Sequence, residues 1–101
     1  MAAIDLFSPI ATTAVSVSAS TASGALTMPT TPANPTVRVY NSTAVVVFIK
    51  FGTSTVTAAT TDTPIPAGGV EAFSINPNVT HIAGITASGT GTLYATTGFG
   101  S

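Results

Sequence analysis

Short segments in which apolar and polar residues alternate recur along this chain, and that period of two restricts its fold more than any other feature. In TTAVSVSAS (12–20), Val15 and Val17 fall on one side of an extended chain and the serines fall on the other. Similar segments follow in the sequence: TVRVYN, TSTVTA, GVEAFSI, VTHIAGITA and GTLYATT. Alternation among β-branched and aromatic residues is typical of β-strands with one buried face. The sequence therefore predicts an all-β fold.

About eight short strands at close spacing predict a two-sheet β-sandwich, with either a jelly-roll or an immunoglobulin-like strand order. The segment PTTPANP (29–35) contains three prolines and cannot pair in the centre of a sheet. We expect residues 1–35 to provide N-terminal strands and this proline-rich arm or connection. Residues 36–101 are expected to form the body of the sandwich. A chain of 101 residues is expected to be one compact domain overall.

One segment departs from alternation. Residues 44–49 (AVVVFI) are all apolar, and Lys50 follows them. In a strand, the odd-numbered residues would face the core, whereas Val46, Phe48 and Lys50 would point to the opposite side. Large apolar side chains that remain exposed together usually mark an interface. We therefore expect this second face to be covered by the N-terminal segment or by another copy of the chain.

Charged residues make up only 5% of the chain, whereas soluble domains carry about 25 %. The formal net charge is −1. The two basic residues, Arg38 and Lys50, cannot form a basic patch, so the sequence predicts no nucleic-acid partner and no membrane surface as partner. We expect Glu71 to pair with one of these cations, within a subunit or across a subunit boundary. The predicted interface residues are Val46, Phe48, Lys50, Glu71 and Arg38.

The candidates for catalysis are few. His81 is the only histidine, and a Ser–His–acid system would have to combine it with Asp5, Asp62 or Glu71. No G-x-S-x-G segment is present, and His81 lies in an alternating segment, which favours a structural role. One histidine with scattered acids and no cysteine does not match the spacing of a metal site. The sequence predicts no catalytic residue, no metal site, no cofactor and no enzymatic activity.

The sequence predicts no targeting signal. The first residues, MAAIDLFSPIATTAV, have no basic n-region, and no apolar run approaches the roughly 20 residues of a membrane helix. These features predict a soluble protein that is made in a cytoplasm and carries no signal peptide. Asn41 and Asn78 begin Asn-x-Thr motifs of the glycosylation type, but such matches arise by chance in a chain this rich in serine and threonine.

The stretch from Val37 to Gly98 contains the patterns VRVYN, VFIKFG, TVTA, PAGGVEAFSI and THIAGITASGTGTLYATTG. These patterns resemble those of small structural proteins of tailed bacteriophages. The resemblance covers about the last two thirds of the chain and depends on strand and turn patterns, not on a catalytic signature. It implies a virion component, and some small β-proteins of that kind decorate or cement capsids.

Low charge agrees with that implication, because permanent contacts avoid the desolvation cost of buried ions. We therefore expect a capsid decoration or cement protein, located on the virion, that forms a homo-oligomer. The resemblance favours a trimer, and it implies the major capsid protein or another virion protein as a partner. The alternative is a tail or fibre module that binds a host-surface glycan. The absence of Trp, and the positions of Tyr40 and Tyr94 inside predicted strands, weigh against this alternative.

Overall fold

The structure, a computed structural model, describes residues 8–27, 35–76 and 78–99. These residues form eight β-strands, and they contain no helix that could span a membrane. The strands are β1 (Ser8–Val17), β2 (Ala22–Ala25), β3 (Thr36–Asn41), β4 (Val47–Gly52), β5 (Thr63–Ile65), β6 (Val70–Ser74), β7 (His81–Thr86) and β8 (Gly91–Phe99). The all-β class predicted from alternation is confirmed.

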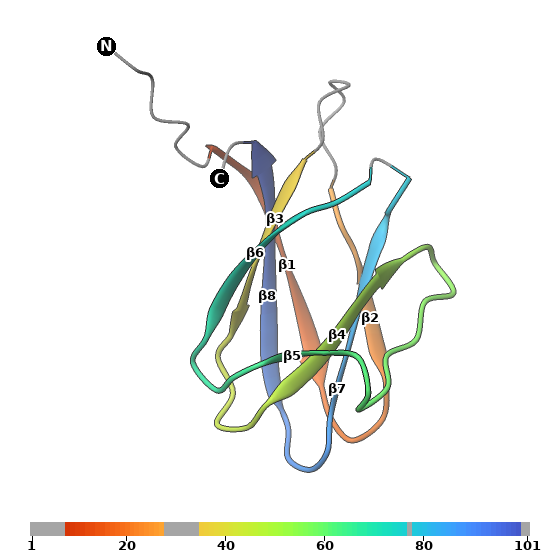
Figure 1. The fold of residues 1–101 in the computed structure, drawn as a ribbon, viewed down its shortest axis with the longest axis vertical. Helices are drawn as coiled ribbons and strands as arrows, with labels where there is room; N and C mark the ends of the chain where they lie inside the picture. The colour runs from red at the N-terminus through yellow and green to blue at the C-terminus, as the bar shows by residue number, and fades with distance from the viewer. Residues whose placement is uncertain (1–7, 28–34, 77, 100–101) are drawn as a thin grey trace.

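The strands form two antiparallel sheets of four, in the orders β1-β8-β3-β6 and β2-β7-β4-β5. The sheets pack face to face (Figure 1), so the predicted two-sheet sandwich is also confirmed. The first strand belongs to one sheet and the second strand to the other. The N-terminal third of the chain therefore contributes to both layers. Of the proline-rich segment 29–35, only Pro35 lies within the described residues, so the predicted arm lies almost wholly outside them.

The strand order decides between the two sandwich types that the sequence left open. β1 pairs with β8, β2 with β7, β3 with β6 and β4 with β5, as in one long antiparallel ribbon. The ribbon is rolled so that β8 also joins β3 and β7 also joins β4. In an immunoglobulin-like sandwich the first two strands share a sheet, whereas here they do not. This is the order of a jelly roll.

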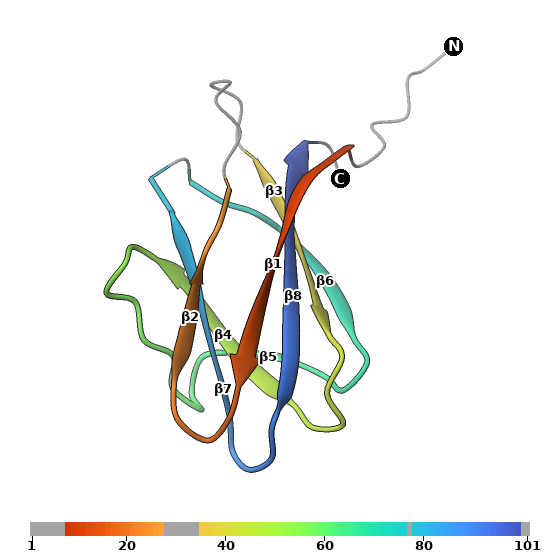
Figure 2. The same cartoon turned by 180° about the vertical axis from the view of Figure 1, so that it is seen from behind.

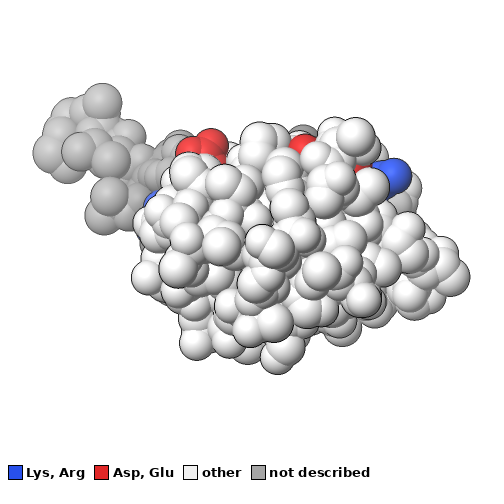
Figure 3. Space-filling model, turned by 90° about the horizontal axis from the view of Figure 1, so that it is seen from below, with Lys and Arg blue, Asp and Glu red and all other residues white. Residues whose placement is uncertain are grey.

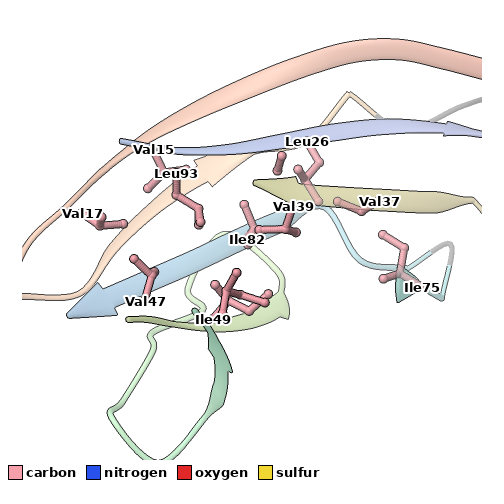
Figure 4. Close-up of a cluster of buried hydrophobic side chains, with 12 residues drawn as sticks. Val15, Val17, Leu26, Val37, Val39, Val47, Ile49, Ile75, Ile82 and Leu93 are labelled. Atoms are coloured by element: carbon pink, nitrogen blue, oxygen red, sulfur yellow. The ribbon is translucent and has the colours of Figure 1, made fainter. Parts of the chain in front are cut away.

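The core lies between the two sheets and consists almost entirely of aliphatic side chains (Figure 4). Its buried members are Val15, Val17, Leu26, Val37, Val39, Val47, Ile49, Ile65, Ile75, Ile82, Leu93 and Ala95. Each fully buried Val, Leu or Ile contributes roughly 1.5–3 kcal/mol through the area removed from water. No buried side-chain nitrogen or oxygen in the described part of the chain lacks a hydrogen-bond partner. Burial of these aliphatic side chains is therefore the main contribution to the stability of the fold.

The strand expected over the apolar run begins later than predicted. β4 starts at Val47, which is fully buried with Ile49, whereas Val45 is half-buried in the preceding loop. The reason is that side chains satisfy the Val45 backbone. The Asn41 amide and the Thr43 hydroxyl both donate to the Val45 carbonyl, at 2.8 Å each, and the Val45 N–H donates to the Thr43 hydroxyl. Such bonds compete with the strand ladder for the backbone.

Two other expectations are corrected. The alternating segment TSTVTA (53–58) is not a strand but part of the β4–β5 loop. The Val56 N–H closes a turn onto the Thr53 carbonyl, and the Ala58 N–H donates to the hydroxyl of Thr21 in another loop. The segment TTDTPIPAGG (60–69), whose prolines and glycines predict a loop, contains β5 instead, with Pro64 at its centre. Proline is tolerated there because β5 lies at the edge of its sheet.

At one end of the sandwich, a buried asparagine joins the β3–β4 loop to the end of β5 and the start of the β5–β6 loop. The loops that join β1 to β2, β3 to β4, β5 to β6 and β7 to β8 all lie at the lower end in Figure 1. Asn41, which is 0% exposed, donates its amide N–H groups to the carbonyls of Val45, Ile65 and Pro66. Its side-chain oxygen accepts from the backbone and the hydroxyl of Thr43. Because its amide nitrogen is buried and bonded, Asn41 is not a glycan acceptor in the folded chain.

Candidate interaction surface

Three large exposed apolar side chains lie in one row on the outer face of the β1-β8-β3-β6 sheet. The strand registers place Ala14 beside Tyr94, Tyr94 beside Tyr40, and Tyr40 beside Val70. All four are exposed, with Tyr94 at 37%, Tyr40 at 42% and Val70 at 52%. The described part of the chain has five large exposed hydrophobic residues, and this row contains three of them. We call Ala14, Tyr94, Tyr40 and Val70 the tyrosine row.

The two tyrosines contact each other across β3 and β8. Their ring centroids are 6.2 Å apart and the ring planes are inclined by 14°, which is a stacked arrangement. Such pairs add about 0.5–1.5 kcal/mol beyond the area that they bury. Because each ring limits the rotamers of the other, little side-chain entropy is left to lose when a partner binds. The row therefore presents a preorganised aromatic surface.

Rows that contain serine and threonine side chains lie on both sides of the tyrosine row. On one side the register places Thr12, Thr96, Arg38 and Ala72 next to one another, and the Thr12 and Thr96 hydroxyls are 2.9 Å apart. On the other side Ser16 pairs with Thr92. Arg38 is the one charged residue in these three rows. Figure 3, a view onto the end where the four loops meet, also shows few charged atoms. A partner could cover this face while desolvating almost no charge.

The outer face of the other sheet carries the predicted second face of β4. Phe48 lies between Pro64 of β5 and Ile85 of β7 in the strand registers, and it is half-buried. Part of its surface is therefore covered by apolar neighbours in its own sheet. Val46, in the loop before β4, remains 41% exposed. Lys50 is exposed beside Ala83 on the same face.

The five predicted interface residues do not form one cluster. Phe48 and Lys50 lie on the outer face of one sheet, with Val46 just before them, whereas Arg38 lies on the outer face of the other sheet. Glu71 pairs in register with Val39 of the core, so its side chain leaves β6 on the face opposite to that of Arg38. The register therefore gives no cross-strand pair between Glu71 and Arg38.

Among the described residues, His81 is the one histidine available for catalysis or metal binding. No pocket is present in that part of the chain, and no group of three or more His, Cys, Asp or Glu side chains gathers there. His81 is half-buried at the start of β7, where its Nδ1 lies 2.8 Å from the Thr80 hydroxyl. The hydroxyl belongs to the adjacent residue. His81 is thus held by a local contact.

Replacing His81 with alanine is expected to lower the free energy of unfolding by no more than about 1 kcal/mol, because one exposed hydrogen bond and a half-buried ring are lost. Urea unfolding followed by circular dichroism would measure this change. Any self-association of the chain should be unaffected. A folded His81→Ala variant that loses the function of the parent would contradict the structural role of this side chain.

The positions of Tyr40 and Tyr94 inside predicted strands weigh against an exposed aromatic site. Both do lie in strands, but both point outward. The signal was available in the alternation. Val39 is fully buried beside Tyr40, and Leu93 and Ala95 are fully buried on either side of Tyr94. Residues that alternate with core residues must face away from the core.

The jelly-roll architecture excludes few functions. Jelly rolls occur among viral capsid proteins, lectins and enzymes of the cupin type, so fold alone does not assign a role. The surface residues must carry that argument. Comparison of the chain with protein-family models, with curated proteins and with solved structures gave no match.

Proposed function

We propose that this chain is a non-enzymatic structural protein of a bacteriophage virion, a capsid decoration or cement protein that acts as a homo-oligomer. The resemblance of residues 37–98 to small virion proteins of tailed phages supports the location. The jelly-roll strand order is compatible with it, since viral capsid proteins use this architecture among others. The major capsid protein, or another virion protein, would be the partner.

The tyrosine row is the observation that carries this proposal. Tyrosine is enriched at protein interfaces, where its ring buries a large area and its hydroxyl still finds a polar partner. Here two tyrosines stand side by side with Val70 and Ala14 on a face that has one charged residue in its three central rows. Such a face suits a lasting protein contact better than a reversible encounter steered by charge.

On a virion, many weak contacts made at once would be enough to hold the protein on the capsid surface. A single row of four exposed side chains is narrower than the interface of about 800 Å² per partner that a stable one-to-one complex requires. Oligomers on a repeating lattice bind at several points at once, and this raises the overall affinity by about 10²–10⁴ without any new contact. The proposed oligomeric state and the small contact face therefore support each other.

The test uses heads purified from phage in which this gene has been deleted. The purified chain is mixed with such heads and sedimented, and the bound copies are counted by quantitative mass spectrometry. We expect saturable binding of the parent chain. Tyr40→Ser with Tyr94→Ser should weaken binding at least tenfold and remain folded, because both side chains are exposed. The matched control is Val46→Ser with Phe48→Ser on the other sheet.

The outcomes separate the two faces. If the tyrosine variant binds as the parent does and the Val46/Phe48 variant does not, the outer face of the β2-β7-β4-β5 sheet is the contact. If the parent chain neither binds the deleted heads nor occurs in purified virions, the capsid proposal is wrong.

A host-glycan module is the second candidate, and the exposed tyrosine pair is the observation that favours it. Sugar rings pack on aromatic side chains, and jelly-roll lectins exist. The pair lies 6.2 Å apart, centroid to centroid, within reach of Arg38 and Thr96 in the next row. A glycan array would test this candidate. Binding to a defined glycan that is lost on Tyr94→Ser, with no binding to heads, would favour the alternative.

A further inference from the structure

The two sheets have four edge strands, and three of them carry features that discourage pairing with another chain. β2 and β5 are only 4 and 3 residues long, and β5 has Pro64 at its centre. β6 carries Glu71 at a position in register with the core residue Val39, and a charge at such a position opposes edge-to-edge contact. Short length, proline and inward-facing charge are the usual protections of an edge.

The fourth edge strand, β1, is protected only at its start. It is 10 residues long, and among the described strands it pairs only with β8. Pro9 and a register shift between Pro9 and Ala11 interrupt its first residues. From Ala11 to Val17 it has no proline, no glycine and no charge. Figure 2 shows this strand running along β8 at the side of the sheet. A strand edge of this length and composition can pair with a strand of another chain.

The run from Ala11 to Val17 is compatible with antiparallel pairing to itself. When a two-fold axis passes beside Ala14, all seven residues of the run find a partner in the second copy. Ala11 then lies opposite Val17, Thr12 opposite Ser16, and Thr13 opposite Val15. In each pair the two residue numbers differ by an even number. The two side chains therefore lie on the same face of the joined sheet. Only small or β-branched side chains meet, and the pairing would add about six to eight backbone hydrogen bonds.

We propose that a second copy of this chain pairs with β1, and that the two sheets join into one eight-stranded sheet about a two-fold axis at Ala14. The consequence for the surface is direct. Ala14 ends the tyrosine row on β1, so the two rows meet at the axis and form one apolar line. Eight side chains would then span about 34 Å, given a strand spacing of about 4.8 Å. The pairing therefore doubles the length of the proposed binding surface.

This inference goes beyond the proposed function and does not depend on it. The contact is isologous, so it closes as a dimer and leaves no free edge of this kind. A trimer, as implied by the resemblance, would require a different contact. The mass of the parent chain in solution therefore separates the two, and it does so whether or not the protein binds heads.

The first test is a cross-link, which is convenient because the chain has no cysteine. In the proposed register the two Ala14 residues face each other with Cα atoms about 4.5–5.5 Å apart, which is within disulfide range. Ala14→Cys, at an exposed position, should give at least about ten times more disulfide-linked dimer under mild oxidation than Ser16→Cys. Two copies of Ser16 lie about 14 Å apart in this register, four residues out of line. A mixture of Thr12→Cys and Ser16→Cys chains should form mixed dimers.

The second test uses charge, with a matched pair of variants. Thr12 and Ser16 are both exposed and lie opposite each other in the dimer, so Thr12→Lys with Ser16→Lys places like charges face to face. This variant should raise the dissociation constant of the dimer about tenfold or more. Thr12→Lys with Ser16→Glu changes the same positions but places opposite charges together, and should dimerise at least as well as the parent. Circular dichroism would verify that both variants remain folded.

Each possible result either supports the proposed dimer or contradicts it. Sedimentation equilibrium should show a dimer for the parent chain and a monomer for the double-lysine variant. A parent that is monomeric at high concentration, a trimer, or a dimer that survives the two lysines would overturn the proposal. Equal cross-linking of Ala14→Cys and Ser16→Cys would overturn the register.

Discussion

Replacing Asn41 with alanine is expected to lower the free energy of unfolding by about 3–5 kcal/mol, close to the whole stability of many domains of this size. The side chain is fully buried and takes part in five hydrogen bonds. Alanine removes the donor to the buried Ile65 carbonyl and the acceptor of the buried Thr43 N–H, and each unsatisfied buried group costs about 1–3 kcal/mol. Urea unfolding, followed by circular dichroism, measures the loss.

Two further variants identify the cause. Asn41→Asp keeps the shape of the side chain but places an oxygen where the amide donates to three carbonyls, so we expect at least as large a loss at neutral pH. Asn76→Ala is the matched control: Asn76 is exposed, and its side chain accepts one bond, from the Asn78 N–H at 2.8 Å. It should cost about 1 kcal/mol or less. Equal losses for Asn41→Ala and Asn76→Ala would show that the Asn41 network does not hold the loops.

Replacing Gly84 with valine is expected to destabilise the fold by about 3 kcal/mol or more, because the two sheets approach closely at this point. Gly84 lies on β7 and is buried. A Cβ atom there would come within 2.8 Å of the Val17 Cγ1 atom and 3.3 Å of the Leu93 Cδ2 atom, across the core. Gly84→Ala should show a smaller loss of the same kind, measured by urea unfolding.

A compensating change tests this explanation. Val17→Ala removes the methyl group nearest to the added Cβ, so it should be less harmful in the Gly84→Ala background than in the parent. Ala72→Val, which enlarges an exposed residue of β6, is the control for adding a β-branched side chain to a strand. It should change the stability by about 0.5 kcal/mol or less. Losses that simply add in the double variant would exclude a clash between β7 and Val17.

Alternation predicted the faces of most strands, since side chains in a strand point alternately to its two sides. Val15 and Val17 alternate with serines and lie in the core, and Arg38 alternates with two buried valines and lies outside. Alternation failed for TSTVTA, where turn and side-chain bonds satisfy the backbone, and for β5, a three-residue strand that exists only because β4 pairs with it. Local pattern cannot reveal a partner that lies elsewhere in the chain.

The sequence likewise predicted one part of the candidate surface, whereas the other part depends on the tertiary structure. The sequence indicated that an apolar face would be left without a cover, because the chain has more large apolar residues in its strands than one inner face can take. It pointed to Val46 and Phe48, yet neighbours in the sheet partly cover Phe48. The tyrosine row was not identified, because Tyr40 and Tyr94 are 54 positions apart in the chain and become neighbours only through the β3–β8 register.

The sequence by itself determined the class of the fold, the inward and outward faces of most strands, and a surface nearly free of charge. Only the tertiary structure decided that β1 and β2 belong to different sheets, that the rolled order is that of a jelly roll, and that Asn41 binds the backbone at the end of β5. The physical reason is the range of the interactions. Alternation depends on the geometry of neighbouring residues, whereas strand order and register depend on hydrogen bonds and packing between segments as distant as β1 and β8.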